Sequence, residues 1–385
     1  MSKDDFSAEE FATRHRRVRE RMEREGIELL LVVHPTNIQY LIGSRTKSYQ
    51  DFQVLLFTLE EAPLTVVTRL AEVTEFSRES LAQDIVGWGG REPEDPLDVF
   101  RRVMTSKGFV GRRVGLEVPA YYLHPRHYEG IKEILGASLV TDASMLVHDL
   151  KLAKSPAEIA YIREAVRIAD AAMHAVAGAV REGATECEVA GEAYRCLVGM
   201  GGDLPASPVN FAAGERTCYG HGMPTTRPIR RGDFMMIEFG AAVRRYCTTI
   251  GRHLCLGEPT SRMRELDAVV REACDACIAE VRPGVSAAAP HLAAKKVIAD
   301  AGLDEYRLHT TGYGIAPGYP PAWGELIHFG DERYTLEPGM VLSVEPPVLI
   351  AEENLGARLI DNVLVTETGA EILSSYPRDI VVVDG

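Results

Sequence analysis

A single helix start near the middle of the chain constrains the fold more than any other feature. Ser155-Pro156-Ala157-Glu158 places an N-cap serine before a proline at the first helical position, with a glutamate three residues after the cap. This combination is typical of a well-capped helix N-terminus. It predicts a long helix from Pro156 to about Arg181, and we interpret this helix as the opening of a second domain. The expected domains are therefore residues 1–152 and 153–385.

The residues before this helix alternate between helical and strand patterns. Helical spacing is expected at residues 6–26, 98–106 and 127–135, and buried strands are expected at 28–33, 53–59, 64–68 and 114–118. Alternation of this kind predicts a small α/β domain.

The second half of the chain groups its helices and its strands. Helices are expected at residues 187–198, 261–280 and 287–300, and strands at 234–239, 246–256, 340–349 and 358–365. This grouping predicts an α+β domain with an antiparallel sheet. The segment 308–329 is rich in Gly, Pro, Tyr and Trp, and we expect it to be a loop that shapes a pocket.

The charge balance excludes several classes of partner. Forty-two Lys and Arg residues stand against 56 Asp and Glu residues, which gives a formal net charge of −14. Nucleic acid and anionic membranes are therefore not expected partners, whereas a small cationic or zwitterionic substrate is compatible with the charge. No apolar stretch approaches the ~20 residues that a membrane-spanning helix needs. The N-terminus lacks an apolar signal region, so we expect a cytoplasmic protein.

The cysteines give no sign of a disulfide scaffold or a zinc site. All seven lie at or beyond Cys187, and reduced thiols are the simplest interpretation. Cys274 and Cys277 form one CxxC, but it falls within an expected helix without a second ligand pair. Because two ligands cannot close a zinc site, we expect a structural role for this motif.

Five local patterns occur in an order that resembles a known family. They are His221 followed eleven positions later by Gly232-Asp233, Ile237-Glu238-Phe239-Gly240, His309-Thr-Thr-Gly-Tyr-Gly314, Glu337-Pro-Gly-Met-Val-Leu-Ser-Val-Glu345-Pro, and Gly356-Ala-Arg-Leu-Ile-Asp-Asn-Val-Leu-Val-Thr366. They resemble the pita-bread fold of aminopeptidase P, prolidase, methionine aminopeptidase and creatinase. The resemblance covers about residues 8–380. It implies a C-terminal pita-bread domain preceded by a smaller creatinase-type N-terminal domain.

The metal-ligand positions implied by this resemblance are largely altered. The metallopeptidases of the family hold two divalent metals with two aspartates, one histidine and two glutamates. In this chain those five positions are occupied by Glu238, Thr249, Tyr313, Glu345 and Ile360. Only two keep a carboxylate, whereas a dinuclear site needs several anionic oxygens and an imidazole. We therefore expect no catalytic metal and no cofactor. Asp361 lies one place after the last position and is expected on the opposite strand face.

Two metal-free branches of the family offer alternatives. His221 matches the acid–base histidine of creatinase by position, but the other creatinase residues fall here on Cys247 and Gly251, which argues against creatine. The ectoine hydrolases, which open the cyclic amidine of ectoine to an acetylated diaminobutyrate, are more similar. Their pattern resembles this chain at Glu238, at Gly312-Tyr313, at Asp361, and at Tyr319-Pro-Pro-Ala-Trp-Gly-Glu325. The segment His221-Gly-Met-Pro and Glu345 depart from that pattern.

The chemistry of C–N cleavage suggests a role for each candidate. The carbon of an amidine or amide must accept a nucleophile while the departing nitrogen receives a proton. We expect Glu238 to attack or to activate water, and His221, with an ordinary pKa of roughly 6.5, to exchange protons. Tyr313 is expected to stabilise the developing charge. The remaining candidates would hold or enclose the substrate: Glu345, Asp361, Tyr319, Trp323, His309 and Glu325.

Several functions remain open from the sequence. The leading hypothesis is a metal-independent C–N hydrolase of the ectoine hydrolase type. The alternatives are an Xaa-Pro dipeptidase or aminopeptidase with an altered metal site, a creatinase-like amidinohydrolase, and a non-catalytic pita-bread binding protein. The resemblance also implies a homodimer whose N-terminal domain covers the partner's pocket, with residues 40–52 as the candidate lid.

Overall fold

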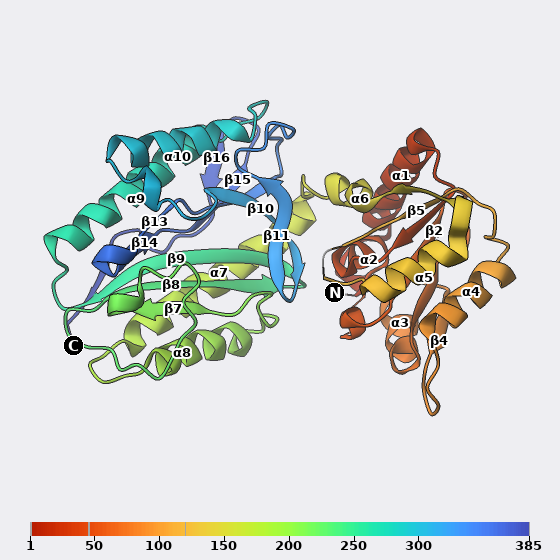
Figure 1. Cartoon of the computed structure of the whole chain (residues 1–385), viewed down its shortest axis with the longest axis horizontal. Coiled ribbons are helices and arrows are strands. Elements are labelled where there is room, and N and C mark those ends of the chain that lie inside the picture. Colours follow the sequence, from red (N-terminus) through yellow and green to blue (C-terminus); the bar gives the residue numbers. More distant parts are fainter. Residues whose placement is uncertain (1, 45–46, 120, 385) are drawn as a thin grey trace. The chain divides into compact units, whose positions relative to one another are not determined.

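The computed structural model describes residues 2–44, 47–119 and 121–384. The chain divides into two compact units, Met1–Lys151 and Leu152–Gly385, one residue before the predicted domain boundary (Figure 1). Arg45 and Thr46, which belong to the predicted lid at residues 40–52, lie outside the described residues.

The N-terminal unit is built on a six-stranded mixed sheet. The strand order is β4 (Asp84–Trp88), β3 (Thr65–Arg69), β2 (Val54–Thr58), β1 (Leu29–Val32), β5 (Val114–Leu116) and β6 (Leu139–Asp142). One face packs against α1 (Ala8–Glu25), α2 (Pro35–Ile42), α3 (Val73–Glu79) and α6 (Ser144–Leu150). The other face packs against α4 (Pro96–Ser106) and α5 (Pro125–Leu135). Because helices cover both faces, the central strands are apolar throughout instead of alternating. The sequence patterns did not reveal α2, α3, α6, β4 or β6.

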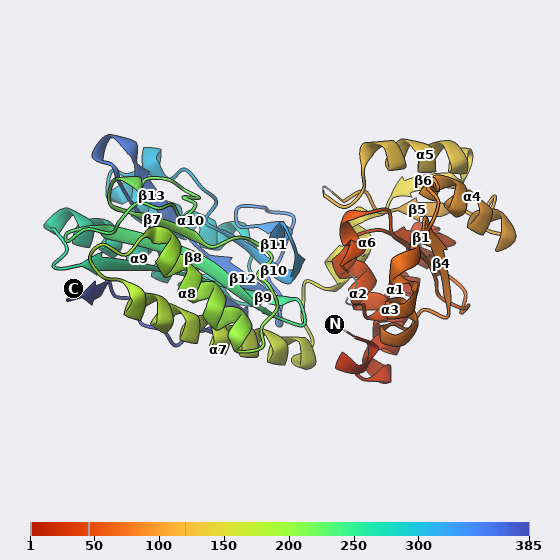
Figure 2. The ribbon, with the colours of Figure 1, turned by 90° about the horizontal axis from the view of Figure 1, so that it is seen from below.

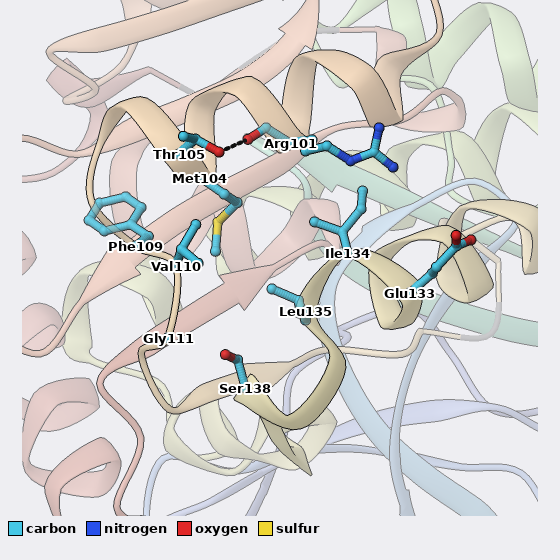
Figure 3. Close-up of a pocket in the computed structure, with 10 residues that line it drawn as sticks. All are labelled: Arg101, Met104, Thr105, Phe109, Val110, Gly111, Glu133, Ile134, Leu135 and Ser138. Carbon is cyan, nitrogen blue, oxygen red and sulfur yellow. Dashed lines mark hydrogen bonds between the residues drawn. The ribbon is translucent and has the colours of Figure 1, made fainter.

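A small pocket lies between α4 and α5 of this unit (Figure 3). It encloses about 280 Å³, and its lining combines the apolar side chains of Met104, Phe109 and Leu135 with the polar Thr105 and Ser138. None of the predicted site residues belongs to this lining.

The C-terminal unit begins with the predicted capped helix. α7 (Pro156–Ala179) starts at Ser155, whose hydroxyl accepts the Glu158 N–H, while the Glu158 carboxylate accepts the Ser155 N–H. Both halves of the predicted capping box are therefore present. α8 (Glu186–Gly199) follows, and α9 (Ser261–Ala279) and α10 (Ala288–Asp300) come later in the chain.

These four helices enclose a nine-stranded sheet. Its main path runs β16 (Ala370–Ile372), β15 (Asp361–Val365), β12 (Val341–Val344), β10 (Gly312–Tyr319), β9 (Tyr246–Leu256), β8 (Phe234–Val243) and β7 (Asn210–Ala213). β11 (Ala322–His328) pairs with β10, and β17 (Val381–Val383) pairs with β9. α7 and α8 cover one side and α9 and α10 the other (Figures 1 and 2). β13 (Pro347–Ile350) and β14 (Leu355–Arg358) form a separate hairpin.

The segment 308–329 is not the loop that its composition predicted. Most of it forms the β10–β11 hairpin. Its glycines lie where neighbouring atoms leave little room for a Cβ atom. A Cβ atom on Gly312 would lie 2.1 Å from the Ser343 carbonyl oxygen, and one on Gly324 would lie 3.1 Å from the Tyr313 ring. Glycine in a strand therefore marks close approach here and not a turn.

The two strands predicted at 340–349 and 358–365 are each broken. β12 ends before Glu345-Pro346, and β13 begins immediately after them. β14 ends at Arg358, and β15 begins at Asp361. Proline cannot donate to a strand ladder, which explains the first break. The breaks place Glu345 directly after β12 and Arg358 at the end of β14.

Candidate active site

The centre of the site is an ion pair between Glu238 and Arg358. Glu238 lies on β8, where its backbone pairs with Asn210 on β7 and with Gly251 on β9. Arg358 Nη2 donates to Glu238 Oε2, and Asn210 Nδ2 donates to the same oxygen at 3.0 Å. The side chains of Arg358 and Glu238 are only 1% and 5% exposed. A buried carboxylate with these partners is held in one orientation.

Glu345 provides a second buried carboxyl group beside this pair. It follows β12 and accepts a hydrogen bond from the Ser343 hydroxyl at 2.9 Å. Burial, reinforced by the negative charge of Glu238, raises the pKa of Glu345 to about 8, although Arg358 acts in the opposite direction. Glu345 is therefore largely protonated at neutral pH and can donate a proton.

Tyr313 and Trp323 form one wall of the site on the β10–β11 hairpin. Tyr313 lies opposite Ser343 of β12. Trp323 Nε1 donates to the Tyr313 hydroxyl at 3.0 Å. Burial raises the pKa of Tyr313 well above its usual value, and Glu345 and Glu238 add to this effect. The hydroxyl therefore keeps its hydrogen, and its hydrogen bond to Glu345 lowers the pKa of that carboxyl group.

Two histidine rings connect Glu345 to the exposed surface. His309 Nδ1 lies 3.4 Å from Glu345 Oε1 and 3.1 Å from the Thr310 carbonyl oxygen. The His309 ring packs edge-to-face against the ring of His221, with 5.2 Å between centroids, and His221 is exposed. Burial lowers the pKa of His309, and the charge of Arg358 lowers it further, so the ring is neutral at neutral pH. His309, predicted only as a binding residue, is thus the histidine beside the carboxyl groups.

The five positions expected to bind metals in relatives do not form a suitable donor set. Thr249 Oγ1 accepts a hydrogen bond from Asn362 Nδ2 at 2.8 Å, and Ile360 is a buried hydrocarbon beside Gly251. Glu238 is committed to Arg358. Within residues 2–44, 47–119 and 121–384, no group of three or more His, Cys, Asp or Glu side chains converges as a metal site requires. These residues do not fit two divalent ions, which need several anionic ligands.

Comparison with known proteins identifies the family. Residues 160–367 match the model of metallopeptidase family M24, and residues 14–152 match the creatinase/prolidase N-terminal domain. The chain belongs to metallopeptidase family M24. It is a hydrolase of that family, and the predicted pita-bread fold with a creatinase-type N-terminal domain is confirmed.

The relatives of this M24 hydrolase include an Xaa-Pro dipeptidase and an ectoine hydrolase. The Xaa-Pro dipeptidase of Pyrococcus furiosus is 30% identical, over 94% of this chain and 97% of the relative. The ectoine hydrolase of Halomonas elongata is 27% identical, over 98% of each. Among solved structures, an Xaa-Pro dipeptidase from Bacillus anthracis is similar with a TM-score of 0.84 and 26% identity, over 97% of this chain and all of that one. No helix in the described part of the M24 hydrolase is long and apolar enough to cross a membrane.

Asp361 does not join the Glu238 cluster in this M24 hydrolase. It forms ion pairs with Arg252 Nη2 and Arg378 Nε, both at 2.8 Å. Asn362, the next residue, faces Thr249, and neighbouring residues of a strand point to opposite faces. Asp361 is therefore paired with two arginines away from Glu238, and its role in holding substrate stays a prediction.

Glu325 and Tyr319 are also engaged elsewhere. Lys154 Nζ donates to Glu325 Oε2 at 2.8 Å, and both side chains are almost completely buried. The guanidinium of Arg245 lies over the Tyr319 ring, 4.7 Å from its centroid. These contacts link the β10–β11 hairpin to neighbouring segments and do not expose either side chain to a substrate.

The sequence analysis missed Arg358, Asn210 and Ser343. Arg358 interrupts the apolar run Leu-Gly-Ala-Arg-Leu-Ile, and a charge in such a run is costly to bury without a partner, so this signal was available. Asn210 and Ser343 carry no comparable signal. Their contribution depends on strand register, which places Asn210 opposite Glu238 and Ser343 opposite Tyr313.

Proposed function

We propose that this M24 protein is a metal-independent hydrolase of C–N bonds in a small nitrogenous solute, and that it opens a cyclic amidine as an ectoine hydrolase does. The observation that carries the proposal is a pair of buried carboxyl groups, Glu238 and Glu345, that share one nearby guanidinium. Arg358 forms an ion pair with Glu238, and its positive charge also lowers the pKa of Glu345. The similarity to the ectoine hydrolase of Halomonas elongata supports it.

In the proposed reaction Glu238 acts on the amidine carbon. Its carboxylate either attacks that carbon or removes a proton from a water molecule that attacks it, and a new C–O bond forms; after direct attack, water must then cleave the bond to Glu238 to release the product. Asn210 and Arg358 share one oxygen, Oε2, as their partner. Oε1 is then the oxygen that acts on substrate or water.

Cleavage also requires a proton for the departing nitrogen. Glu345, protonated at neutral pH because burial raises its pKa, is positioned to supply it as the ring C–N bond breaks. His309, beside Glu345 Oε1, can return a proton to Glu345, and His221 can exchange that proton with solvent. The Tyr313 hydroxyl can donate to negative charge that develops on the substrate.

The charge of the site supports a cationic or zwitterionic substrate. Glu238, Glu345 and Arg358 together carry one negative charge when both carboxyl groups are ionised, and none when Glu345 is protonated. A bound amidinium would be attracted to the Glu238 carboxylate, while Glu345 keeps the proton that it supplies to the departing nitrogen. A metal cation would compete with Arg358 for Glu238.

An Xaa-Pro dipeptidase is the second candidate, favoured by the name of the Pyrococcus furiosus relative. This activity would have to proceed with Thr249, Tyr313 and Ile360 at three ligand positions. Metal analysis of the purified protein separates the two candidates before any substrate is tested.

The test combines metal analysis with substrate assays. Chelator-treated protein should hydrolyse ectoine or a related cyclic amidine at the same rate as untreated protein, and Glu238→Gln should lower kcat by at least about a hundredfold. Arg163→Met, which removes one side of an exposed ion pair with Glu371, is the control and should retain full activity. Stoichiometric manganese, iron or zinc, together with chelator-sensitive cleavage of Xaa-Pro dipeptides, would instead establish the second candidate.

We further propose a homodimer in the cytoplasm, in which the N-terminal domain of one subunit covers the site of the other. Light scattering of the full chain measures the assembly. A monomer with full activity would reject a lid supplied by the partner.

A further inference from the structure

A buried histidine lies directly behind the Glu238–Arg358 pair. His253 is on β9, opposite Met236 of β8, and Glu238 is two residues beyond Met236 on the same face of that strand. The Arg358 backbone N–H donates to His253 Nε2 at 2.8 Å. On the other side of the ring, His253 Nδ1 lies 2.8 Å from Asp267 Oδ1 of α9. Both side chains are at most 5% exposed.

The hydrogen-bond partners of the His253 ring determine which of its two nitrogens carries the hydrogen. A backbone amide can only donate, so Nε2 must present its lone pair to Arg358 and the ring hydrogen must be on Nδ1. That hydrogen is donated to Asp267. Burial alone would raise the pKa of Asp267, but its hydrogen bond from His253 and its contact with Arg271, 2.6 Å away, lower it overall. Asp267 is therefore an ionised acceptor that favours this single tautomer.

Arg358 depends on this contact because its own hairpin holds it weakly. Arg358 is the last residue of β14, and its partner in the hairpin is Pro347, which has no N–H to donate. The next backbone anchor is Ile360, two residues later, which exchanges hydrogen bonds with Gly251 of β9, and β15 of the large sheet begins at Asp361. The bond to His253 therefore fixes the backbone from which the guanidinium reaches Glu238.

We propose that His253 and Asp267 are positioning residues that hold the Arg358 backbone, and through the Arg358 guanidinium orient the Glu238 carboxylate for hydrolysis. The catalytic part of this inference rests on the proposed function. The positional part, that the His253 ring determines where Arg358 and its guanidinium lie, does not. Hydrogen-bonded partners behind a reactive group commonly change its efficiency by about ten- to a hundredfold.

The test compares His253→Leu with His253→Gln in the full-length protein. Leucine removes the acceptor, whereas the glutamine amide oxygen can replace Nε2. Hydrogen exchange resolved to single residues should show the Arg358 amide exchanging at least about tenfold faster in the leucine variant, with protection restored by glutamine. With an active substrate, kcat should fall about tenfold or more in His253→Leu and recover in His253→Gln, while KM changes less. His174→Leu, at an exposed histidine, is the control.

Each outcome decides the proposal. Faster exchange at Arg358 with an unchanged kcat overturns the positioning role, as does an unchanged exchange rate. If His253→Leu does not fold, Asp267→Asn is the second variant. It keeps the shape of the side chain but no longer holds the His253 ring hydrogen on Nδ1. An unchanged kcat in Asp267→Asn also overturns the positioning role. If the wild-type protein hydrolyses none of the substrates, the proposed function fails by itself. The positional part is then decided by a crystal structure of His253→Leu, in which a retained Arg358–Glu238 contact would reject it.

Discussion

Replacing Arg358 with methionine should destabilise the C-terminal unit far more than an ordinary loss of one ion pair. The Arg358 side chain is 1% exposed and its partner Glu238 is 5% exposed, so the remaining carboxylate cannot be solvated where it stands. Glu345, raised in pKa partly by Glu238, lies beside them and offers no compensating positive charge. Removal of one partner from a buried pair typically costs about 3–5 kcal/mol. We expect Arg358→Met to lower the free energy of unfolding by this amount.

A double-mutant cycle isolates the interaction. In Arg358→Met/Glu238→Gln neither charge remains, so we expect most of the lost stability to return, with a coupling energy of at least about 2 kcal/mol. Arg163→Met provides the exposed control. Arg163 and Glu371 are 47% and 42% exposed and meet at 2.7 Å, and loss of such a pair should cost less than about 1 kcal/mol.

Urea unfolding at neutral pH measures the wild type, Arg358→Met, Glu238→Gln, the double variant and Arg163→Met. Trp323 lies in the C-terminal unit, and Trp88, the other tryptophan of the chain, lies in β4. A Trp88→Phe background therefore makes the fluorescence report the unit that carries the mutations. Equal losses in Arg358→Met and in the double variant would refute the argument, because they would show that Glu238 does not depend on the guanidinium.

Three further predictions concern other buried groups. The pKa of Glu345 is about 8 in the folded protein against an ordinary 4.5, so the folded state binds a proton more tightly; its stabilising effect is complete below pH 4.5 and is lost as the pH rises towards 8, at up to about 1.4 kcal/mol per pH unit. Urea unfolding of Glu345→Gln across this range should show a weaker pH dependence, and an unchanged slope would assign the proton to another group. Lys154→Met should cost about 3–5 kcal/mol because it strands Glu325, and Lys154→Met/Glu325→Leu should recover most of that loss in thermal unfolding; no recovery would mean that the pair does not interact. Because burial lowers the pKa of His309 below 6.5, kcat/KM should still be undiminished at pH 6.5 and should fall only at lower pH. His309→Gln should remove this acidic limb from the pH profile, and an unaltered limb would exclude His309 from proton exchange.

Much of the fold could be predicted because local signals and the final structure agree. The cap at Ser155 begins α7, and the strand predicted at 246–256 is β9. The β10–β11 hairpin was missed because glycine is ambiguous: it is favoured in turns, but it is also required wherever strands approach closely. Gly312, which leaves no room for a Cβ atom beside Ser343, is an example of the second case.

The site was only partly predictable for a different reason. Motif order alone predicted Glu238, Glu345 and Tyr313 as site residues, and the structure brings these side chains together. Motif order does not indicate which nearby cation balances these groups, because that depends on how β14 crosses β8 and β9. Nor does it show that Asp361 points towards Arg252 and Arg378, since a one-residue step reverses the face on which a strand residue lies.

The Glu238–Arg358 pair also bears on how such a site could change during evolution. A single new carboxylate at Thr249 or Ile360 would place a second anion near Glu345 before any metal could be bound, and each step taken alone would therefore be unfavourable. Ile360 adds a steric barrier, because its side chain occupies the space above Gly251, where an added Cβ would lie 2.5 Å from it. Several substitutions would have to occur together to restore a metal site. Under the proposed metal-independent function, single substitutions would therefore not lead this chain back to a metal site.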